Sequence, residues 1–217
     1  LSKTIVLDKN SSQKHVIDII QEANNDNNIT GILVQMPLPD HMNAKAVVDA
    51  ISPIKDVDGL HALNQGKLML KEEGIIPATP KGIMRLLDEY HVDLKGKNAL
   101  VIGRSILVGN PVAQLLLQRD ATVTMAHSKT KNLKELCQTM DVIVSAVGKP
   151  KIITEDMVKE GAVIVDVGIN RGEDGKLSGD VDFENVSQIA SYITPVPGGI
   201  GPMTIAMLIT YVVKAAN

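Results

Sequence analysis

The apolar positions of the chain follow two kinds of spacing. Continuous apolar runs predict strands over 4–7 and 31–36, and the second run is apolar on both faces, as in a covered parallel strand. Apolar residues at helical spacing predict a helix capped by Ser11 or Ser12, and a second helix capped by Asn43. A third helix is predicted to begin at Thr79-Pro80, with Thr79 as the cap and Pro80 at the first helical position.

From Asn98 onward, strands and helices alternate more regularly. The predicted elements are strands over 99–102, 121–125, 141–147 and 162–167, and helices near 110–119, 131–138 and 154–160. Thr154 is expected to cap the last of these helices and Gly161 to end it. Such an alternation predicts an α/β fold with a doubly wound parallel sheet. A Pro-Gly-rich loop over 193–204 is predicted to be irregular, and the apolar stretch from it to Val213 helical.

Composition and charge exclude several classes of protein. The single cysteine, Cys137, cannot form an internal disulfide, and no cysteine and histidine residues stand at metal-ligand spacing. The net charge of −3 and the aromatic content of 2% argue against nucleic-acid binding. The longest apolar stretch, over 202–213, is shorter than the roughly 20 residues that span a membrane. We therefore expect no nucleic-acid or membrane partner and no metal.

The first crossover of the second half carries a candidate phosphate site. Gly103 closes a predicted strand and Gly109 opens a helix, so a pyrophosphate can approach the backbone and the helix N-terminus. The loop is not the Gly-x-Gly-x-x-Gly fingerprint, and an ordinary strand-to-helix turn is the alternative. The next strand ends without the acid that binds a ribose 2′-hydroxyl. Arg104 and Lys129 instead favour the 2′-phosphate of NADP, unless both are merely solvated surface charges.

In the first half, polar groups follow the predicted strand and a nearby loop. Gln35 lies at the carboxyl end of the strand over 31–36, where ligands of open α/β sheets bind. Asp56 and Asp58 are expected to point to the same side of a loop, either to hold a divalent cation or to accept N–H donors of a heterocycle. For Asp56, hydrogen bonding to the loop backbone is an equal alternative. Four scattered histidines are interpreted as surface or structural residues: His15, His41, His61 and His91.

Six motifs in order across nearly the whole chain carry a specific resemblance. They are Gly31-x-Leu33-Val34-Gln35-x-Pro37-Leu38-Pro39, Lys55-Asp56-Val57-Asp58-Gly59, Pro77-x-Thr79-Pro80-x-Gly82, Gly103-Arg104-Ser105-x-x-Val108-Gly109-x-Pro111, His127-Ser128-x-Thr130 and Pro195-Val196-Pro197-Gly198-Gly199-x-Gly201-Pro202-Met203-Thr204. With these motifs the chain closely resembles the bifunctional methylenetetrahydrofolate dehydrogenase/methenyltetrahydrofolate cyclohydrolase family.

The resemblance implies two α/β domains and two linked reactions. A folate-binding catalytic domain would comprise 1–80 and 200–217, with the C-terminal helix returning to it, and 81–199 would form a Rossmann-like domain that binds NADP. The enzyme would oxidise 5,10-methylenetetrahydrofolate with NADP⁺ and hydrolyse the methenyl product to 10-formyltetrahydrofolate, in the one-carbon metabolism that serves purine biosynthesis. The resemblance also implies a homodimer formed through the NADP domain, and we expect a cytoplasmic enzyme.

The resemblance assigns roles to individual residues. Asp58 would bind the pterin edge, and Gln35 would lie beside the reacting centre and tune a catalytic lysine. The loop Pro197-Gly198-Gly199 would line the folate pocket. The remaining candidates would contact the cofactor: Gly103, Arg104 and Ser105 at its phosphate and ribose, Ser128 at the 2′-phosphate, and Ile169 at the nicotinamide end through backbone groups.

The sequence departs from the family in one respect. The family's general acid/base is the lysine of a Tyr-x-x-x-Lys motif, and Tyr90 is followed at the lysine position by Leu94. Neither Lys3 nor Lys14 has a tyrosine four residues before it. We therefore expect the lysine helix to precede Leu1, the complete gene product to be bifunctional, and the chain as written to lack cyclohydrolase activity.

Two alternatives remain open from the sequence. A non-catalytic NADP-binding or regulatory protein of the same fold would account for the missing motif, and it would bind NADP without forming NADPH. A dehydrogenase of similar two-domain build, such as a shikimate dehydrogenase, would need its own lysine and aspartate arrangement in the first domain, which is not found.

Overall fold

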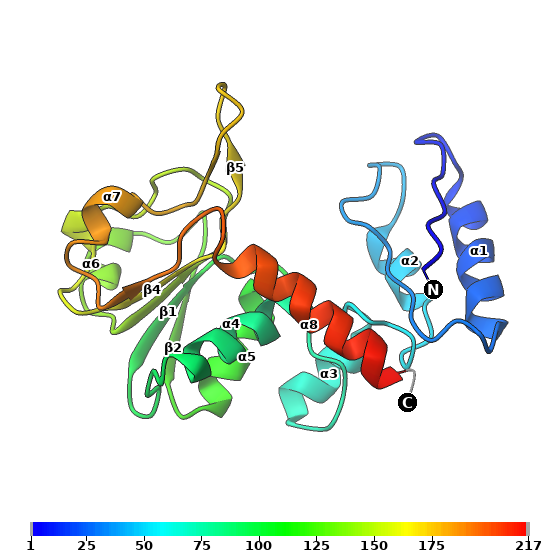
Figure 1. Ribbon diagram of the computed structural model, residues 1–217, viewed down its shortest axis with the longest axis horizontal. Helices are drawn as coiled ribbons and strands as arrows, with labels where there is room; N and C mark the ends of the chain where they lie inside the picture. The colour runs from blue at the N-terminus through cyan, green and yellow to red at the C-terminus, as the bar shows by residue number, and fades with distance from the viewer. Residues whose placement is uncertain (1, 216–217) are drawn as a thin grey trace.

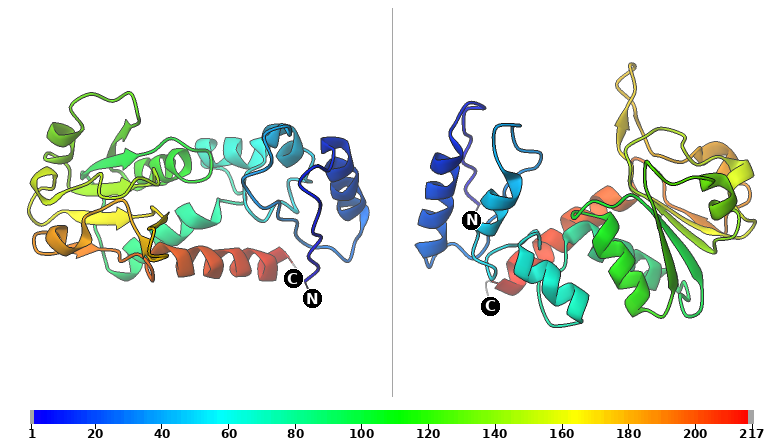
Figure 2. Two further views of the ribbon diagram at one scale, coloured as in Figure 1. Left: turned by 90° about the horizontal axis from the view of Figure 1, so that it is seen from above. Right: turned by 180° about the vertical axis from the view of Figure 1, so that it is seen from behind.

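The computed structural model describes residues 2–215 of the chain. Figure 1 shows two lobes: a first lobe, residues 2–60, and a sheet domain, residues 98–193. The segment between the lobes contains two helices, α3 (Ala62–Leu70) and α4 (Ala78–Glu89). Helix α3 is not among the helices predicted from the sequence. The C-terminal helix α8 (Ile200–Ala215) leads from the sheet domain back to the first lobe (Figures 1 and 2).

The first lobe contains the two helices that the sequence predicts. Helix α1 (Gln13–Asn25) is capped by Ser12, whose hydroxyl accepts from the His15 amide at 3.2 Å. Helix α2 (Ala44–Asp49) is capped by Asn43, whose side chain accepts from the Ala46 amide at 3.1 Å. Their apolar faces form a small core, whose buried members are Val16, Ile20, Val47 and Ile51.

The two strands predicted in the first lobe are wrong. Residues 4–7 and 31–36 form no strand, and the single bridge within residues 2–60 joins Ile32 to Asp56 in parallel. The second run is not covered on both faces either, because Leu33 is 42% exposed. An apolar run forms a strand only where a neighbouring segment satisfies its backbone N–H and C=O groups. Among the described residues of these two runs, only Ile32 has such a partner. Its amide donates to the Lys55 carbonyl at 2.7 Å.

The sheet domain confirms the predicted parallel sheet. Its strand order is β2-β1-β3-β4-β7, and all pairs are parallel. The strands are β1 (Asn98–Ile102), β2 (Thr122–Ala126), β3 (Val142–Ser145), β4 (Val163–Asp166) and β7 (Tyr192–Ile193). The first four lie within two residues of their predicted bounds, whereas the short β7 and the hairpin β5 (Asn170–Arg171) and β6 (Leu177–Ser178) were not predicted.

Helices cover both faces of this sheet. Val101 and Val144 point to a core shared with α4 and α5 (Gly109–Gln118). Leu100 and Ile143 point to the opposite core. That core lies under α6 (Leu133–Cys137), the 3₁₀ turn η1 (Glu155–Met157) and α7 (Phe183–Val186). Apolar residues on both faces explain why these strands read as continuous apolar runs.

Two predicted caps are wrong. Helix α4 begins before Thr79, and the Thr79 hydroxyl lies 2.9 Å from the Thr204 hydroxyl of α8 instead of capping its own helix. The helix predicted near 154–160 is only the turn η1, and the Thr154 hydroxyl bonds to Asp156. Val158 is already extended and buried in the core under η1, so packing ends the helix early. Gly161, with φ +78°, donates to the Ile189 carbonyl.

Helix α8 packs along α4, in the segment between the two lobes. A Cβ on Gly82 would lie 3.1 Å from Met203, so the two helices approach closely at this point. Further along, the Tyr211 hydroxyl accepts from the Ile76 amide at 3.0 Å, and the Lys81 ammonium lies 3.8 Å from the Tyr211 ring centroid. Burial raises the pKa of Tyr211 and lowers that of Lys81. Among residues 2–215, no helix is long and apolar enough to cross a membrane.

Candidate active site

The parallel register brings most predicted cofactor residues to one edge of the sheet. Ile102 pairs with Ala126 and Ser145, and Ser145 pairs with Asp166, so β1 to β4 end side by side. The loops that follow these ends carry the predicted residues: Gly103, Arg104 and Ser105 after β1, Ser128 after β2, and Ile169 after β4. Ligands of open α/β sheets bind at this carboxyl edge.

The loop after β1 is a tight backbone cradle. Gly103 has φ +120°, and a Cβ there would lie 2.6 Å from the Ala146 carbonyl oxygen. A Cβ on Gly109 would lie 2.3 Å from the Gly103 carbonyl oxygen. Only glycine permits these two approaches, and together they bring the loop against the N-terminus of α5. The amides of Gly109 and Asn110 already bond to Ser105, and Pro111 has no N–H, so this helix start offers a phosphate mainly the positive end of the helix dipole.

The Ser105 hydroxyl already bonds to the backbone at the start of α5. Its hydroxyl accepts from the Val108 amide at 3.1 Å and from the Gly109 amide at 3.4 Å. A serine hydroxyl that accepts in this way still has its own proton to donate. Ser105 can therefore shape the loop and donate one hydrogen bond to a ligand oxygen at the same time.

The loops after β1 and β2 present cations and no acid at this edge. Arg104, Ser128 and Lys129 are exposed, and none of their three side chains makes a hydrogen bond or ion pair with another residue in the range 2–215. The second loop is held by the His127 amide, which donates to Thr130 at 2.9 Å, and by the Lys129 amide, which donates to the His127 ring at 3.1 Å. His127 thus has a structural role in this loop, and the unpaired side chains of Arg104 and Lys129 suit an anion.

Two buried aspartates that the sequence analysis missed hold the loops after β3 and β4. Asp166 accepts from the amides of Gly168, Asp180 and Val181 at 2.9–3.0 Å. Burial is the main cause that raises the pKa of Asp166, and these three amides lower it in part. Asp180 is fully buried and accepts from the loop that follows β3. Aspartates in glycine-rich segments are typical of exposed turns, so no local signal separates these two from ordinary turn residues.

In the first lobe, Asp56 has a structural role. Its side chain is 1% exposed, and Oδ2 accepts from the His61 amide at 2.8 Å and from Asn64 at 2.9 Å. These bonds fix the start of α3, where His61 is the N-cap. The backbone alternative predicted for Asp56 is therefore confirmed. Its Oδ1 atom is buried and has no hydrogen-bond partner among the described residues.

Asp58, two residues further on, differs from Asp56 in its hydrogen bonding. Its carboxylate is half-buried and accepts no hydrogen bond from any residue between 2 and 215. Burial, and secondarily the charge of Asp56, raise the pKa of Asp58. Removing a carboxylate from water without giving it a partner costs free energy. This is the arrangement expected of a group whose hydrogen-bond donors come from a ligand.

Gln35 and the loop over 197–199 complete the set of predicted residues. The parallel bridge between Ile32 and Asp56 places Gln35 and Asp58 on neighbouring segments, both beyond the bridge in the same direction. Gln35 is exposed, and its Nε2 donates to the Met36 carbonyl at 3.0 Å, which leaves Oε1 to accept. The loop Pro197-Gly198-Gly199 joins β7 to α8, and a Cβ on Gly199 would lie 2.5 Å from the Pro195 carbonyl oxygen.

The predicted residues therefore fall into two groups. Those for the cofactor gather at the carboxyl edge of the sheet, and Gln35 and Asp58 lie in the first lobe. Helix α8 and the loop before it lead from the sheet domain back toward the first lobe (Figure 1). Within the described part of the chain, no group of three or more His, Cys, Asp or Glu residues could hold a metal ion.

Comparison with protein families gives two matches that together cover most of the chain. Residues 77–217 match the family model "Tetrahydrofolate dehydrogenase/cyclohydrolase, NAD(P)-binding domain". Residues 1–58 match "Tetrahydrofolate dehydrogenase/cyclohydrolase, catalytic domain". The chain is also 56% identical over 211 residues to the bifunctional protein FolD of Campylobacter curvus, covering 97% of this chain and 73% of the relative. With the protein of the same name from Streptococcus agalactiae it is 54% identical, covering 99% of this chain and 76% of the relative.

Solved structures agree with these matches. The bifunctional FolD methylenetetrahydrofolate dehydrogenase/cyclohydrolase of Campylobacter jejuni superposes with a TM-score of 0.94 at 51% identity, covering 96% of this chain and 74% of that one. A Trypanosoma brucei methylenetetrahydrofolate dehydrogenase-cyclohydrolase, solved with NADP cofactor and an inhibitor, has a TM-score of 0.91 at 36% identity. It covers 95% of this chain and 73% of its own.

Proposed function

Because the chain belongs to the tetrahydrofolate dehydrogenase/cyclohydrolase family, we propose that its two groups of site residues serve one active site. The enzyme oxidises 5,10-methylenetetrahydrofolate to 5,10-methenyltetrahydrofolate with NADP⁺ and hydrolyses the product to 10-formyltetrahydrofolate. A non-catalytic nucleotide-binding protein of the same fold is not favoured, because relatives that are 54–56% identical bear the name of the bifunctional enzyme.

The observation that carries the proposed folate site is the unpartnered carboxylate of Asp58. A pterin ring presents two parallel N–H donors on its 2-amino-4-oxo edge, and a carboxylate accepts such a pair with both oxygens. Asp58 is half-buried without a donor among residues 2–215, so a bound pterin supplies what the fold leaves out. The free energy lost by burying the charge is recovered when the ligand binds.

The residues at the sheet edge suit NADP. The cradle formed by Gly103, Gly109 and the start of α5 accommodates the pyrophosphate, and Ser105 donates its hydroxyl proton. Arg104 and Ser128 bind the 2′-phosphate by charge-assisted hydrogen bonds. The backbone around Ile169, which is 66% exposed, holds the nicotinamide end. NADP⁺, when bound, accepts the hydride from the methylene carbon of the folate.

The remaining residues align the folate and its reaction centre. The loop Pro197-Gly198-Gly199 lines the folate pocket from the sheet-domain side. Gln35 lies beside the reacting carbon, where its free Oε1 accepts a hydrogen bond from the group that moves protons. In the cyclohydrolase step water attacks the methenyl carbon, and opening of the ring then needs a proton transfer. Because both reactions occur at the same carbon, one pterin site serves both.

Three broader features belong to the same proposal. The folate-binding domain comprises 1–80 and 200–217, and the NADP domain comprises 81–199; the course of α8 back to the first lobe supports this division (Figure 2). The enzyme is a homodimer formed through its NADP domains, an expectation from the family resemblance that light scattering tests. We place the enzyme in the cytoplasm on the same resemblance.

An assay of NADPH formation tests the function. The complete product of the gene is incubated with 5,10-methylenetetrahydrofolate and NADP⁺, and the absorbance of NADPH is followed together with the formation of 10-formyltetrahydrofolate. We expect NADPH to form only when both substrates are present. Binding of NADP⁺ without any NADPH formation would contradict the proposal and support the non-catalytic alternative.

A further inference from the structure

Asp180 lies beneath the sheet edge and binds only hydrogen-bond donors. Its side chain is fully buried. Oδ2 accepts from the Ser145 hydroxyl at 3.0 Å and from the amides of Val147 at 2.8 Å and Gly148 at 3.3 Å. Oδ1 accepts from the Lys149 amide at 2.8 Å and from the Asn170 side chain at 3.2 Å. Five donors therefore converge on one carboxylate: one from the end of β3, three from the loop after it and one from the start of β5.

These contacts fix the two loops relative to each other. Residues 146–149 follow β3, and residues 167–170 follow β4. A Cβ on Gly168 would lie 2.1 Å from Asp180 Oδ1, so the second loop rests directly on this carboxylate. Asp166 reinforces the arrangement, because its Oδ1 accepts from the Asp180 amide at 2.9 Å. The first loop in turn touches the phosphate cradle, since the Ala146 carbonyl lies against Gly103.

The charge of Asp180 is balanced by donors and not by a cation. Among residues 2–215, no lysine, arginine or histidine side chain pairs with Asp180 or Asp166. A neutral acid or amide would point a hydrogen at one of these donors, so only the ionised carboxylate satisfies all five contacts. An asparagine at this position accepts hydrogen bonds with its Oδ1 atom only. Its Nδ2 hydrogens face the donors that the second carboxylate oxygen had accepted. It therefore leaves buried N–H groups unpaired and frees one of the two loops.

We propose that Asp180 is a positioning residue that holds the loops over 146–149 and 167–170 in the arrangement that receives the nicotinamide ring. The inference rests on the proposed function, in which the backbone near Ile169 binds the nicotinamide end. Asp180 lies below the loops and does not touch the cofactor. The adenosine half of NADP binds at the loops after β1 and β2, whose described residues make no hydrogen bond to Asp180.

Two nucleotides, NADPH and 2′,5′-ADP, test binding at the two halves of the cofactor site separately. The emission of NADPH on binding reports the environment of its nicotinamide ring, whereas 2′,5′-ADP carries the 2′-phosphate and no nicotinamide. For Asp180→Asn we expect the emission gain of bound NADPH to be lost and its affinity to fall about tenfold. The affinity for 2′,5′-ADP is expected to stay within about twofold, because the loops after β1 and β2 keep their own hydrogen bonds and make none to Asp180.

Asp182→Asn is the matched control. Asp182 lies two residues away and pairs with Lys151 at 3.0 Å, outside both loops, so its substitution is expected to change neither nucleotide's signal. An Asp180→Asn variant that binds NADPH with the emission of the wild type would overturn the inference. A wild type that binds neither nucleotide would refute the cofactor assignment itself, and the inference with it.

Ser145→Ala decides the question if Asp180→Asn does not fold. This substitution removes one donor to Asp180 and leaves the charge and the backbone donors in place. We expect a reduced NADPH emission gain with unchanged 2′,5′-ADP affinity, in a protein with the circular dichroism of the wild type. Equal emission for Ser145→Ala and the wild type would contradict the proposed positioning role.

Discussion

The preference for NADP over NAD is expected to depend on Arg104. Arg104 is exposed and its side chain has no partner among residues 2–215, so Arg104→Ala removes no interaction of the fold. We therefore expect the free energy of unfolding to change by less than about 0.5 kcal/mol. What the substitution removes is a charge-assisted hydrogen bond to the 2′-phosphate, which NAD lacks.

The size of the effect follows from the exposure of this site. A hydrogen bond to a charged group contributes about 1.5–3 kcal/mol, which corresponds to a factor of roughly 10–150 in affinity. Arg104 faces water, and dissolved salt screens its attraction to the 2′-phosphate. The lower end of this range of affinity therefore applies, about tenfold near physiological ionic strength. The dissociation constant for NADP⁺ should rise by that factor, and the constant for NAD⁺ should stay the same.

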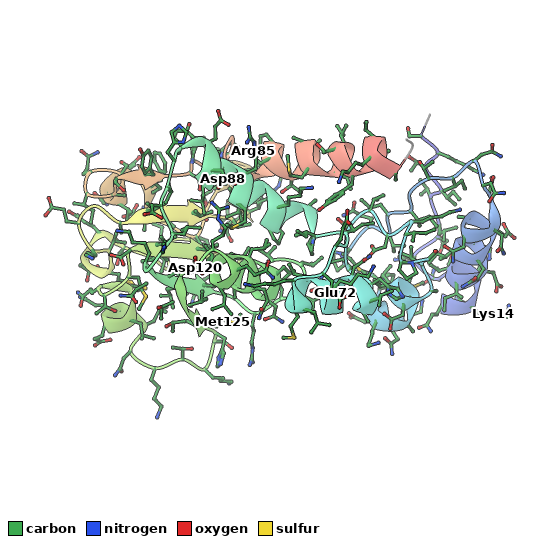
Figure 3. All side chains as sticks on the ribbon, turned by 90° about the horizontal axis from the view of Figure 1, so that it is seen from below. Lys14, Glu72, Arg85, Asp88, Asp120 and Met125 are labelled. Carbon is green, nitrogen blue, oxygen red and sulfur yellow. The ribbon has the colours of Figure 1, made fainter. Side chains whose placement is uncertain are left out.

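Calorimetric titration with NADP⁺ and with NAD⁺ measures both constants. Arg85→Ala is the matched control, because Arg85 lies on α4 (Figure 3) and pairs with Glu89 at 2.8 Å on the exposed face of that helix. It removes the same charge at a distance from the sheet edge and should leave the preference unchanged. Ser128→Ala should weaken NADP⁺ binding in the same direction. If neither Arg104→Ala nor Ser128→Ala alters the preference, the account of 2′-phosphate recognition is wrong.

Three further predictions concern stability and the cradle. Asp58→Asn should raise the midpoint of thermal unfolding at neutral pH, because burial raises the pKa of Asp58 and its ionised form destabilises the fold. This gain should vanish toward about pH 4, where the wild-type carboxyl group also becomes neutral. Tyr211→Phe should cost about 1–3 kcal/mol in urea unfolding, since the Ile76 amide loses its partner. Gly109→Ala should weaken NADP⁺ binding in calorimetry without loss of circular dichroism, because its Cβ would press on Gly103.

The sheet domain could be predicted from the sequence because its signals are local. Buried parallel strands such as β1 and β3 are continuous apolar runs, and glycines such as Gly109 mark where the following helix begins. Gly103, Gly109, Arg104 and Lys129 followed from the same pattern, since the carboxyl ends of parallel strands meet at one edge. The roles of Ser105, Ser128 and Ile169 were implied by the family resemblance alone. Helix caps at Ser12 and Asn43 were predicted because a cap depends on only about four residues.

The errors arise where the outcome depends on distant residues. The runs over 4–7 and 31–36 have the composition of strands, but a strand also needs a partner, and the only bridge within residues 2–60 is Ile32 to Asp56. Thr79 has the local features of a cap, yet its hydroxyl bonds to the hydroxyl of Thr204, which lies near the other end of the chain. Asp180 depends on donors that β3 and β4 bring together, so its burial has no local signature.

The most direct test of the account is Asp58→Ala in the complete product of the gene. The account places one pterin site at Asp58 and uses it for both reactions, while NADP binds at the separate sheet edge. We predict that Asp58→Ala abolishes methylenetetrahydrofolate-dependent NADPH formation and methenyltetrahydrofolate hydrolysis together, with NADP⁺ affinity unchanged. Survival of either activity near the wild-type rate would contradict the single shared site.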